Sequence, residues 1–121
     1  MGSQQKYDTR GNEYMAIEAT YMDFCKHSAR YPIHREKEYL MIGLMNEAGE
    51  VGGAYKKEIR DNVDNKELII GEMGDVMWYL TNLCRVYGIT ITNLMNNNMQ
   101  KLLTRMTPEQ AKAYRESMGF D

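Results

Sequence analysis

Apolar residues recur along most of this chain every three or four positions, which is the period of one face of an α-helix. The pattern predicts four main helices, at residues 13–27, 35–60, 66–87 and about 90–105, and a short fifth helix after Thr107. No stretch of convincing length alternates with the period of a strand. Short connections favour antiparallel neighbours, so we expect an all-α fold: an antiparallel four-helix bundle core with a short extra C-terminal helix.

The residues between the predicted helices are those that end or start a helix. Pro32 stops the first helix, because the residue before a proline is pushed out of the α region. The polar cluster DNVDN, at residues 61–65, predicts a turn. Gly88 follows the third helix as a C-cap. Thr107 and Pro108 together form an N-cap and a first helical position.

Length and composition narrow the class of protein. The 121 residues, 43% hydrophobic and 26% charged, suit one globular domain at residues 13–121, preceded by a polar, flexible tail at residues 1–12. With a net charge of −2 and no basic run longer than two lysines, we expect no binding to nucleic acid or to an anionic membrane. We find neither a membrane-spanning run nor a signal peptide, and Cys25 and Cys84 fit no metal or redox spacing. We therefore expect a soluble, cytoplasmic protein with reduced thiols.

Two pairs of carboxylates stand out inside the second and third predicted helices. Glu47 pairs with Glu50, and Glu72 pairs with Asp75; each pair is three residues apart and so lies on one helix face. From residue 68 to residue 84 the only charges are Glu72 and Asp75, and such an apolar helix belongs inside a bundle. Burying two carboxylates there is costly unless a positive charge compensates them.

A divalent cation would compensate these charges. All four side chains offer hard oxygen ligands, which suit Mg²⁺, Mn²⁺ or Ca²⁺ better than zinc. Di-iron bundles need Glu-x-x-His pairs, and the histidines here lie outside both motifs, so iron is disfavoured. Glycine weakens a helix interior, so the glycines around the acids need a reason, such as close helix approach or room for a ligand; they are Gly43, Gly49, Gly52, Gly53, Gly71 and Gly74.

An alternative explanation needs no metal. The acids could be surface groups of amphipathic helices in a purely helical interaction module, with Lys56, Lys57 and Arg60 as their partners. Two such motifs on successive long helices, one of which is otherwise nearly free of charge, favour the metal site.

Three segments carry a resemblance to a known family: GLMNEAGEVGGAYKKEIRD, ELIIGEMGDVMWYL and NMQKLLTR. They resemble the MazG-like family of all-α nucleoside triphosphate pyrophosphohydrolases, whose relatives include dimeric dUTPases and dCTP pyrophosphatases. The family pattern is Glu-Glu-x-x-Glu, a variable gap, and Glu-x-x-Asp. Here Asn46-Glu47-x-x-Glu50 is followed by 21 residues and then Glu72-x-x-Asp75. The likeness extends from about residue 14 to residue 105.

The resemblance implies hydrolysis of a nucleoside triphosphate between its α and β phosphates, giving the monophosphate and pyrophosphate. It implies that Glu47, Glu50, Glu72 and Asp75 hold Mg²⁺, with Mn²⁺ as a substitute. Either Glu50 or Glu47 would also orient or deprotonate the attacking water. The family is generally oligomeric, so the resemblance further implies a homo-oligomer, a dimer or a tetramer.

Substrate contacts are expected from other positions. By family position Lys101 should contact phosphate, and Asn98 one helical turn away should contact sugar or phosphate, with Arg105 a further turn along. Lys57 shares a helix strip with Glu50 and could add a phosphate contact, although a solvated lysine explains it equally well. Trp78 is one of several aromatic residues that could stack on the base, and core packing is the alternative for each.

One position departs from the family pattern. Asn46 stands where the family has the first glutamate. The asparagine keeps a hydrogen-bond acceptor but lacks the negative charge. This departure leaves a second possibility open, namely a catalytically silent regulator of the same fold that binds nucleotide or metal.

Overall fold

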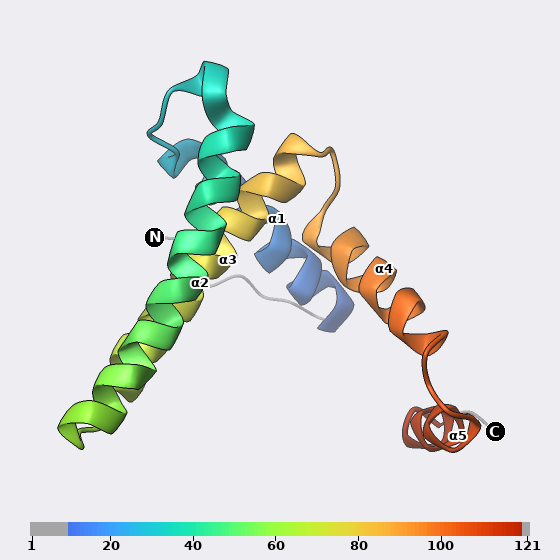
Figure 1. Cartoon of the computed structure of the whole chain (residues 1–121). Coiled ribbons are helices and arrows are strands. Elements are labelled where there is room, and N and C mark those ends of the chain that lie inside the picture. The colour runs from blue at the N-terminus through green and yellow to red at the C-terminus, as the bar shows by residue number, and fades with distance from the viewer. Residues whose placement is uncertain (1–9, 120–121) are drawn as a thin grey trace. The chain divides into compact units, whose positions relative to one another are not determined.

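The computed structural model of the chain describes residues 10–119, with side chains from Ile17 onward, and the described part is helical throughout (Figure 1). The elements are α1 (Arg10–Ser28), a 3₁₀ turn η1 (Ile33–Arg35), α2 (Glu36–Asp61), α3 (Lys66–Val86), α4 (Ile91–Leu103) and α5 (Pro108–Ser117). No strand occurs among residues 10–119. The all-α prediction is confirmed, and each predicted helix exists within three residues of its expected bounds. The first helix begins at Arg10, inside the predicted tail, and residues 1–9 lie outside the described part.

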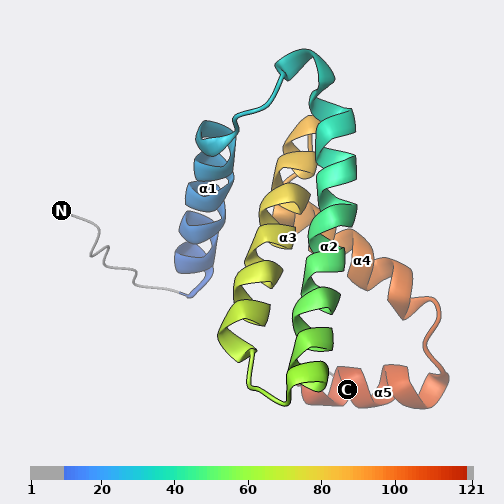
Figure 2. The same ribbon diagram turned by 60° about the vertical axis from the view of Figure 1, so that its left-hand side comes forward.

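The chain divides after Thr90 into two compact units. In the first unit, α2 and α3 run antiparallel as a long hairpin, and α1 lies along α3 (Figures 1 and 2). The second unit contains α4 and α5. Because α4 belongs to the second unit, the four-helix arrangement of the core stays a prediction, and so does the single domain. None of the described helices is long and apolar enough to cross a membrane.

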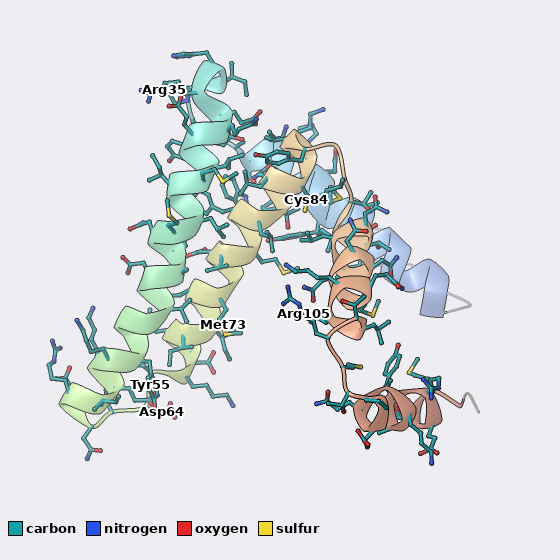
Figure 3. The ribbon with its side chains drawn as sticks, turned by 45° about the vertical axis from the view of Figure 1, so that its right-hand side comes forward. Arg35, Tyr55, Asp64, Met73, Cys84 and Arg105 are labelled. Carbon is teal, nitrogen blue, oxygen red and sulfur yellow. The ribbon has the colours of Figure 1, made fainter. Side chains whose placement is uncertain are left out.

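The polar turn between α2 and α3 is fixed by its own side chains. Asn62 adopts the left-handed conformation, with φ of 52°, which ends α2. The main-chain N–H of Asn65 donates to Glu58 Oε1 at 3.0 Å, and its side-chain amide donates to the carbonyl of Ala54 at 3.0 Å. Asp64, labelled at this turn in Figure 3, accepts from the N–H of Lys66 at 2.9 Å. These bonds hold the two long helices at a set distance and register.

Most of the core lies where α1 and α2 meet the C-terminal half of α3, and its buried apolar residues are Cys25, Leu40, Leu83 and Cys84. Ala54 is buried separately, beside the hairpin turn. Both cysteines are free, as predicted. Asn82 is fully buried and donates to the main-chain carbonyl of Cys25 at 3.2 Å, so it ties α3 to α1. Arg85 donates to Asn82 Oδ1 at 2.9 Å and to Glu36 Oε2 at 2.7 Å, so it ties α3 to the start of α2.

The predicted helix ends are present where the sequence signals placed them. Gly88 takes φ of 71° after α3, and the next N–H, of Ile89, bonds back to the carbonyl of Cys84 at 2.9 Å. Thr107 and Gln110 form a reciprocal capping box at the start of α5, with Pro108 as its first residue. Both signals act locally, which is why they could be read from the sequence alone.

Candidate metal centre and adjoining cavity

The hairpin brings three of the four predicted acids together. Glu47 of α2 and Glu72 and Asp75 of α3 each offer one carboxylate oxygen, and these oxygens all lie within 4.8 Å of one another. Glu47 and Glu72 are half-buried, whereas Asp75 is exposed. An opening bordered by carboxylate oxygens at this spacing has the dimensions and the donor type of a site for a hard divalent cation.

A close approach of α2 and α3 sets the register that forms this cluster. The ring of Tyr79 packs directly on the backbone of Gly43, and a β-carbon at position 43 would overlap the ring atoms. Glu47 follows Gly43 by one helical turn on α2, and Asp75 precedes Tyr79 by one turn on α3. Since the helices are antiparallel, contact between positions 43 and 79 carries Glu47 toward Asp75. Gly43 is therefore the glycine for which close helix approach is the explanation.

The negative charges of the cluster repel one another, and this repulsion alters the pKa values of nearby groups. Partial burial raises the pKa of Glu47, and the negative charges of Asp75, Glu72 and Glu50 raise it further. The pKa of Tyr79 is also raised, first by burial, then by a hydrogen bond with Tyr39, and then by the charges of Tyr39, Glu47 and Asp75. Acids that disfavour one another's ionised forms gain from a cation placed among them.

Glu50 is not a member of this cluster. It lies on the exposed side of α2 and lines a cavity of about 300 Å³, together with Glu72 and three basic side chains. The complete lining is Gly49, Glu50, Gly53, Ala54, Lys56, Lys57, Arg60, Leu68 and Glu72. Glu72 thus belongs both to the cluster and to the cavity wall, and Lys57 shares the cavity with Glu50. We refer to this hollow as the basic cavity.

The remaining predicted substrate contacts belong to α3 and to the second unit. Trp78 contacts Tyr79 edge to face, with ring centroids 4.9 Å apart, and its indole N–H donates to Ser28 Oγ of α1 at 2.8 Å. Asn98 and Lys101 are exposed, one turn apart on α4, and Arg105 follows that helix. These three residues belong to the second unit, so their roles stay predictions, as does that of Trp78.

One neighbour of the cluster was not predicted from the sequence. Tyr39 of α2 shares a hydrogen bond with Tyr79, and their ring centroids are 6.3 Å apart. Tyr31 extends the stack on Tyr39, at 4.9 Å. The sequence contains one signal for this contact, because Tyr39 precedes Gly43 by one helical turn. The signal can be interpreted only when the residue of α3 that faces Gly43 is known.

Comparison with known proteins gives a family that agrees with this geometry. The family model described as MazG nucleotide pyrophosphohydrolase domain matches residues 35–108. The chain belongs to this family. The match contains all of α2, α3 and α4, and so it contains both acidic pairs. Nucleotide pyrophosphohydrolase activity is the general activity of MazG domains, and the MazG family is generally metal-dependent.

Two curated relatives are similar to this MazG chain. The Gene 37 protein of Mycobacterium phage L5 is 33% identical, over 55% of this chain and 63% of the phage protein. The uncharacterized protein YvdC of Bacillus subtilis (strain 168) is 36% identical, over 55% of this chain and 74% of YvdC. The alignment thus spans less than two thirds of the phage protein's length. No solved structure matches the chain.

Proposed function

We propose that this MazG protein hydrolyses a nucleoside triphosphate, ribo or deoxy, to the monophosphate and pyrophosphate with the help of Mg²⁺, and so controls or cleans the nucleotide pool. The observation that carries the proposal is the convergence of Glu47, Glu72 and Asp75 across the α2–α3 hairpin. Membership of the MazG family supports the reaction class, and the cluster supports the dependence on a metal.

The donor set fits Mg²⁺, with Mn²⁺ as a substitute. Three carboxylate oxygens within 4.8 Å of one another are hard ligands, and the described residues place no lysine, arginine or histidine in an ion pair with any of them. Glu47, Glu72 and Asp75 would hold the cation, with Glu50 completing the predicted set from the side of the basic cavity. When bound, the cation would neutralise phosphate charge and lower the pKa of a water.

The reaction that we propose is an in-line displacement at the α phosphorus. A water oxygen forms a bond to this phosphorus, and the bond from the α phosphorus to the oxygen that bridges it to the β phosphate breaks, so pyrophosphate departs with that oxygen. One proton of the water passes to a carboxylate, and the other stays on the oxygen that becomes part of the monophosphate. Glu47 or Glu50 would accept this proton, as the family resemblance implies.

Other residues are proposed to hold the substrate. Lys57 in the basic cavity and Lys101, Asn98 and Arg105 in or just after α4 would contact the phosphates or the sugar, and Trp78 would contact the base. We also propose a homo-oligomer, a dimer or a tetramer. The apolar side chains of α3 support this assembly, since Ile70, Met73 and Met77 are exposed by 50%, 54% and 46%.

The test is turnover of a panel of canonical and damaged ribo- and deoxynucleoside triphosphates with Mg²⁺, with products separated by chromatography. We expect the wild-type protein to release monophosphate and pyrophosphate, and Glu72→Gln and Asp75→Asn to abolish turnover. Glu67→Gln, which removes an acid from the first turn of α3 outside the cluster, is the matched control and should remain active.

Thermal unfolding with and without Mg²⁺ separates the alternatives. A cation held only by the folded protein, at 100 times its dissociation constant, stabilises it by about 2.7 kcal/mol. We expect this gain in the wild-type protein and in Glu67→Gln, and its loss in the two cluster variants. Diphosphate plus phosphate as products would contradict cleavage at the α phosphorus. Stabilisation by Mg²⁺ without turnover would instead identify a silent binding protein, consistent with Asn46.

A further inference from the structure

The basic cavity brings together charges that the metal cluster does not explain. Lys56, Lys57 and Arg60 lie within five residues at the end of α2, and all three line the same hollow of about 300 Å³. Glu72 forms part of its wall and is also a member of the acidic cluster. The hollow therefore adjoins the candidate metal centre at Glu72, and it adds positive charge on the side that faces the hairpin turn.

We propose that the basic cavity is the subsite for the pyrophosphate end of the substrate, with Lys56, Lys57 and Arg60 as its phosphate contacts. This inference rests on the proposed function and adds the direction in which the substrate lies along the hairpin. The β and γ phosphates would point toward the turn at residues 62–65, and the nucleoside would point toward Tyr79.

The size and charge of the cavity favour a phosphate tail over a nucleoside. Its volume is at the lower limit of about 300–1,000 Å³ for sites that enclose a drug-sized ligand. Leu68 is the largest apolar side chain in the lining, and no aromatic ring is among the lining residues. A base would find nothing there to stack on, whereas an arginine fork and two lysines are the usual contacts of phosphate oxygens.

The basic side chains can reach a phosphate without breaking the fold. Among the described residues neither lysine has a carboxylate partner, and Arg60 bonds only to its exposed neighbour Asp61, through two contacts of 2.7 Å. Both basic side chains act on Asp61: the hydrogen bond from Arg60 is the main cause that lowers its pKa, and the charge of Lys57 lowers it further. An exposed pair of adjacent residues contributes little, so phosphate can replace Asp61 on the arginine.

Two glycines lie in the wall of the cavity. A β-carbon on Gly49 or Gly53 would meet no atom within 4 Å, so neither glycine is required by close helix packing and both face open space. Glycine is unfavourable in a helix interior by about 1 kcal/mol relative to alanine, and packing against a neighbouring helix does not require either residue here. Both positions therefore leave room for a ligand in the cavity.

The spacing along α2 is consistent with a triphosphate laid along the hairpin. Lys57 lies seven residues, or about 10 Å, beyond Glu50, and helical side chains slope back toward the N-terminus of their helix. Lys57 therefore extends toward the acids, and Arg60 stands one turn behind it. Tyr79 lies on the other side of the cluster, against Gly43.

The test uses pyrophosphate itself as the probe. Inhibition by pyrophosphate and by the product monophosphate is measured with Mg²⁺ for the wild-type protein, for the double variant Lys57→Gln, Arg60→Gln, and for Gly53→Leu, which fills the hollow. We expect pyrophosphate inhibition to weaken at least tenfold in both variants and monophosphate inhibition to change less than twofold. The controls are Lys66→Gln, which removes a cation outside the cavity, and Gly71→Leu, whose β-carbon also meets open space; both should match the wild-type protein.

The possible results separate this inference from the proposed function. If pyrophosphate inhibits the active variants as strongly as the wild-type protein, the inference is overturned and the proposed function stays intact. If only monophosphate inhibition weakens, the substrate lies in the opposite direction, and the inference is overturned as well. If the wild-type protein has no turnover, calorimetric titration with pyrophosphate and Mg²⁺ decides instead. Binding that the double variant loses and Lys66→Gln keeps supports the subsite, and binding that is absent or equal in both overturns it. Circular dichroism shows that each variant is folded.

Discussion

Substitution of Gly43 by alanine tests the register on which the metal centre depends. In most helix interiors this change is stabilising by about 1 kcal/mol, because alanine is the better helix former. At position 43, however, the new β-carbon would overlap the ring of Tyr79, and overpacking of this kind costs about 1–3 kcal/mol. We therefore expect the free energy of unfolding to fall by as much as about 2 kcal/mol. The ring would have to leave Gly43, and with it the hydrogen bond to Tyr39.

The assay is urea and thermal unfolding followed by circular dichroism at 222 nm. Gly74→Ala on α3 is the matched control, because its β-carbon would meet no atom within 4 Å; it should stabilise the protein by up to about 1 kcal/mol. A difference of 1 kcal/mol corresponds to roughly 4 °C in Tm for a domain of this size. In a double-mutant cycle with Tyr79→Ala, Gly43→Ala should become stabilising, because the overlapping ring is gone.

The sign of the effect decides the matter. If Gly43→Ala stabilises the protein as much as Gly74→Ala does, then Tyr79 does not pack on Gly43. The register of α2 against α3 would then be wrong, and the convergence of Glu47 with Asp75 would lose its basis.

Two further substitutions test the links between the helices. The pKa of Glu36 is lowered, chiefly by a hydrogen bond from Tyr31 and then by Arg85. Glu36 therefore contributes to the free energy of unfolding at pH values above its unfolded-state pKa. This contribution is lost as the pH falls through its folded-state pKa. Glu36→Gln should flatten this acid-side loss in a Tm titration, and an unchanged slope would contradict the assignment. Asn82→Ala should lower the free energy of unfolding by about 2–3 kcal/mol in urea titrations, because it leaves buried partners unpaired. The exposed control Asn96→Ala should change it little, and equal effects of the two would contradict the role of Asn82.

The helices and their ends were predictable because their signals are local. Thr107, Pro108 and Gln110 act within one turn, and Gly88 is needed where the backbone takes a positive φ. The bounds of α2 and α3 were therefore within a residue or two of the prediction. The arrangement of α4 could not be read in this way, because nothing in one amphipathic helix states which surface its apolar face covers.

The candidate site was predictable only in part, for a related reason. Spacing placed Glu47 and Glu50 on one face of α2, but a difference of three residues turns a side chain by about 60°. The register with α3 decided that Glu47 faces Glu72 and Asp75 and that Glu50 faces the cavity. That register depends on the contact between Gly43 and Tyr79, which joins residues far apart in sequence and leaves no periodic trace.

The protein also contains its own optical probe for the attachment of α1. Trp78 is the single tryptophan of the chain, and its indole N–H is bound to Ser28 near the end of α1. Its emission should therefore respond when α1 separates from α3, even while the α2–α3 hairpin stays helical. Comparing fluorescence with circular dichroism during one unfolding experiment would show whether α1 leaves first or whether the three helices unfold as one cooperative unit.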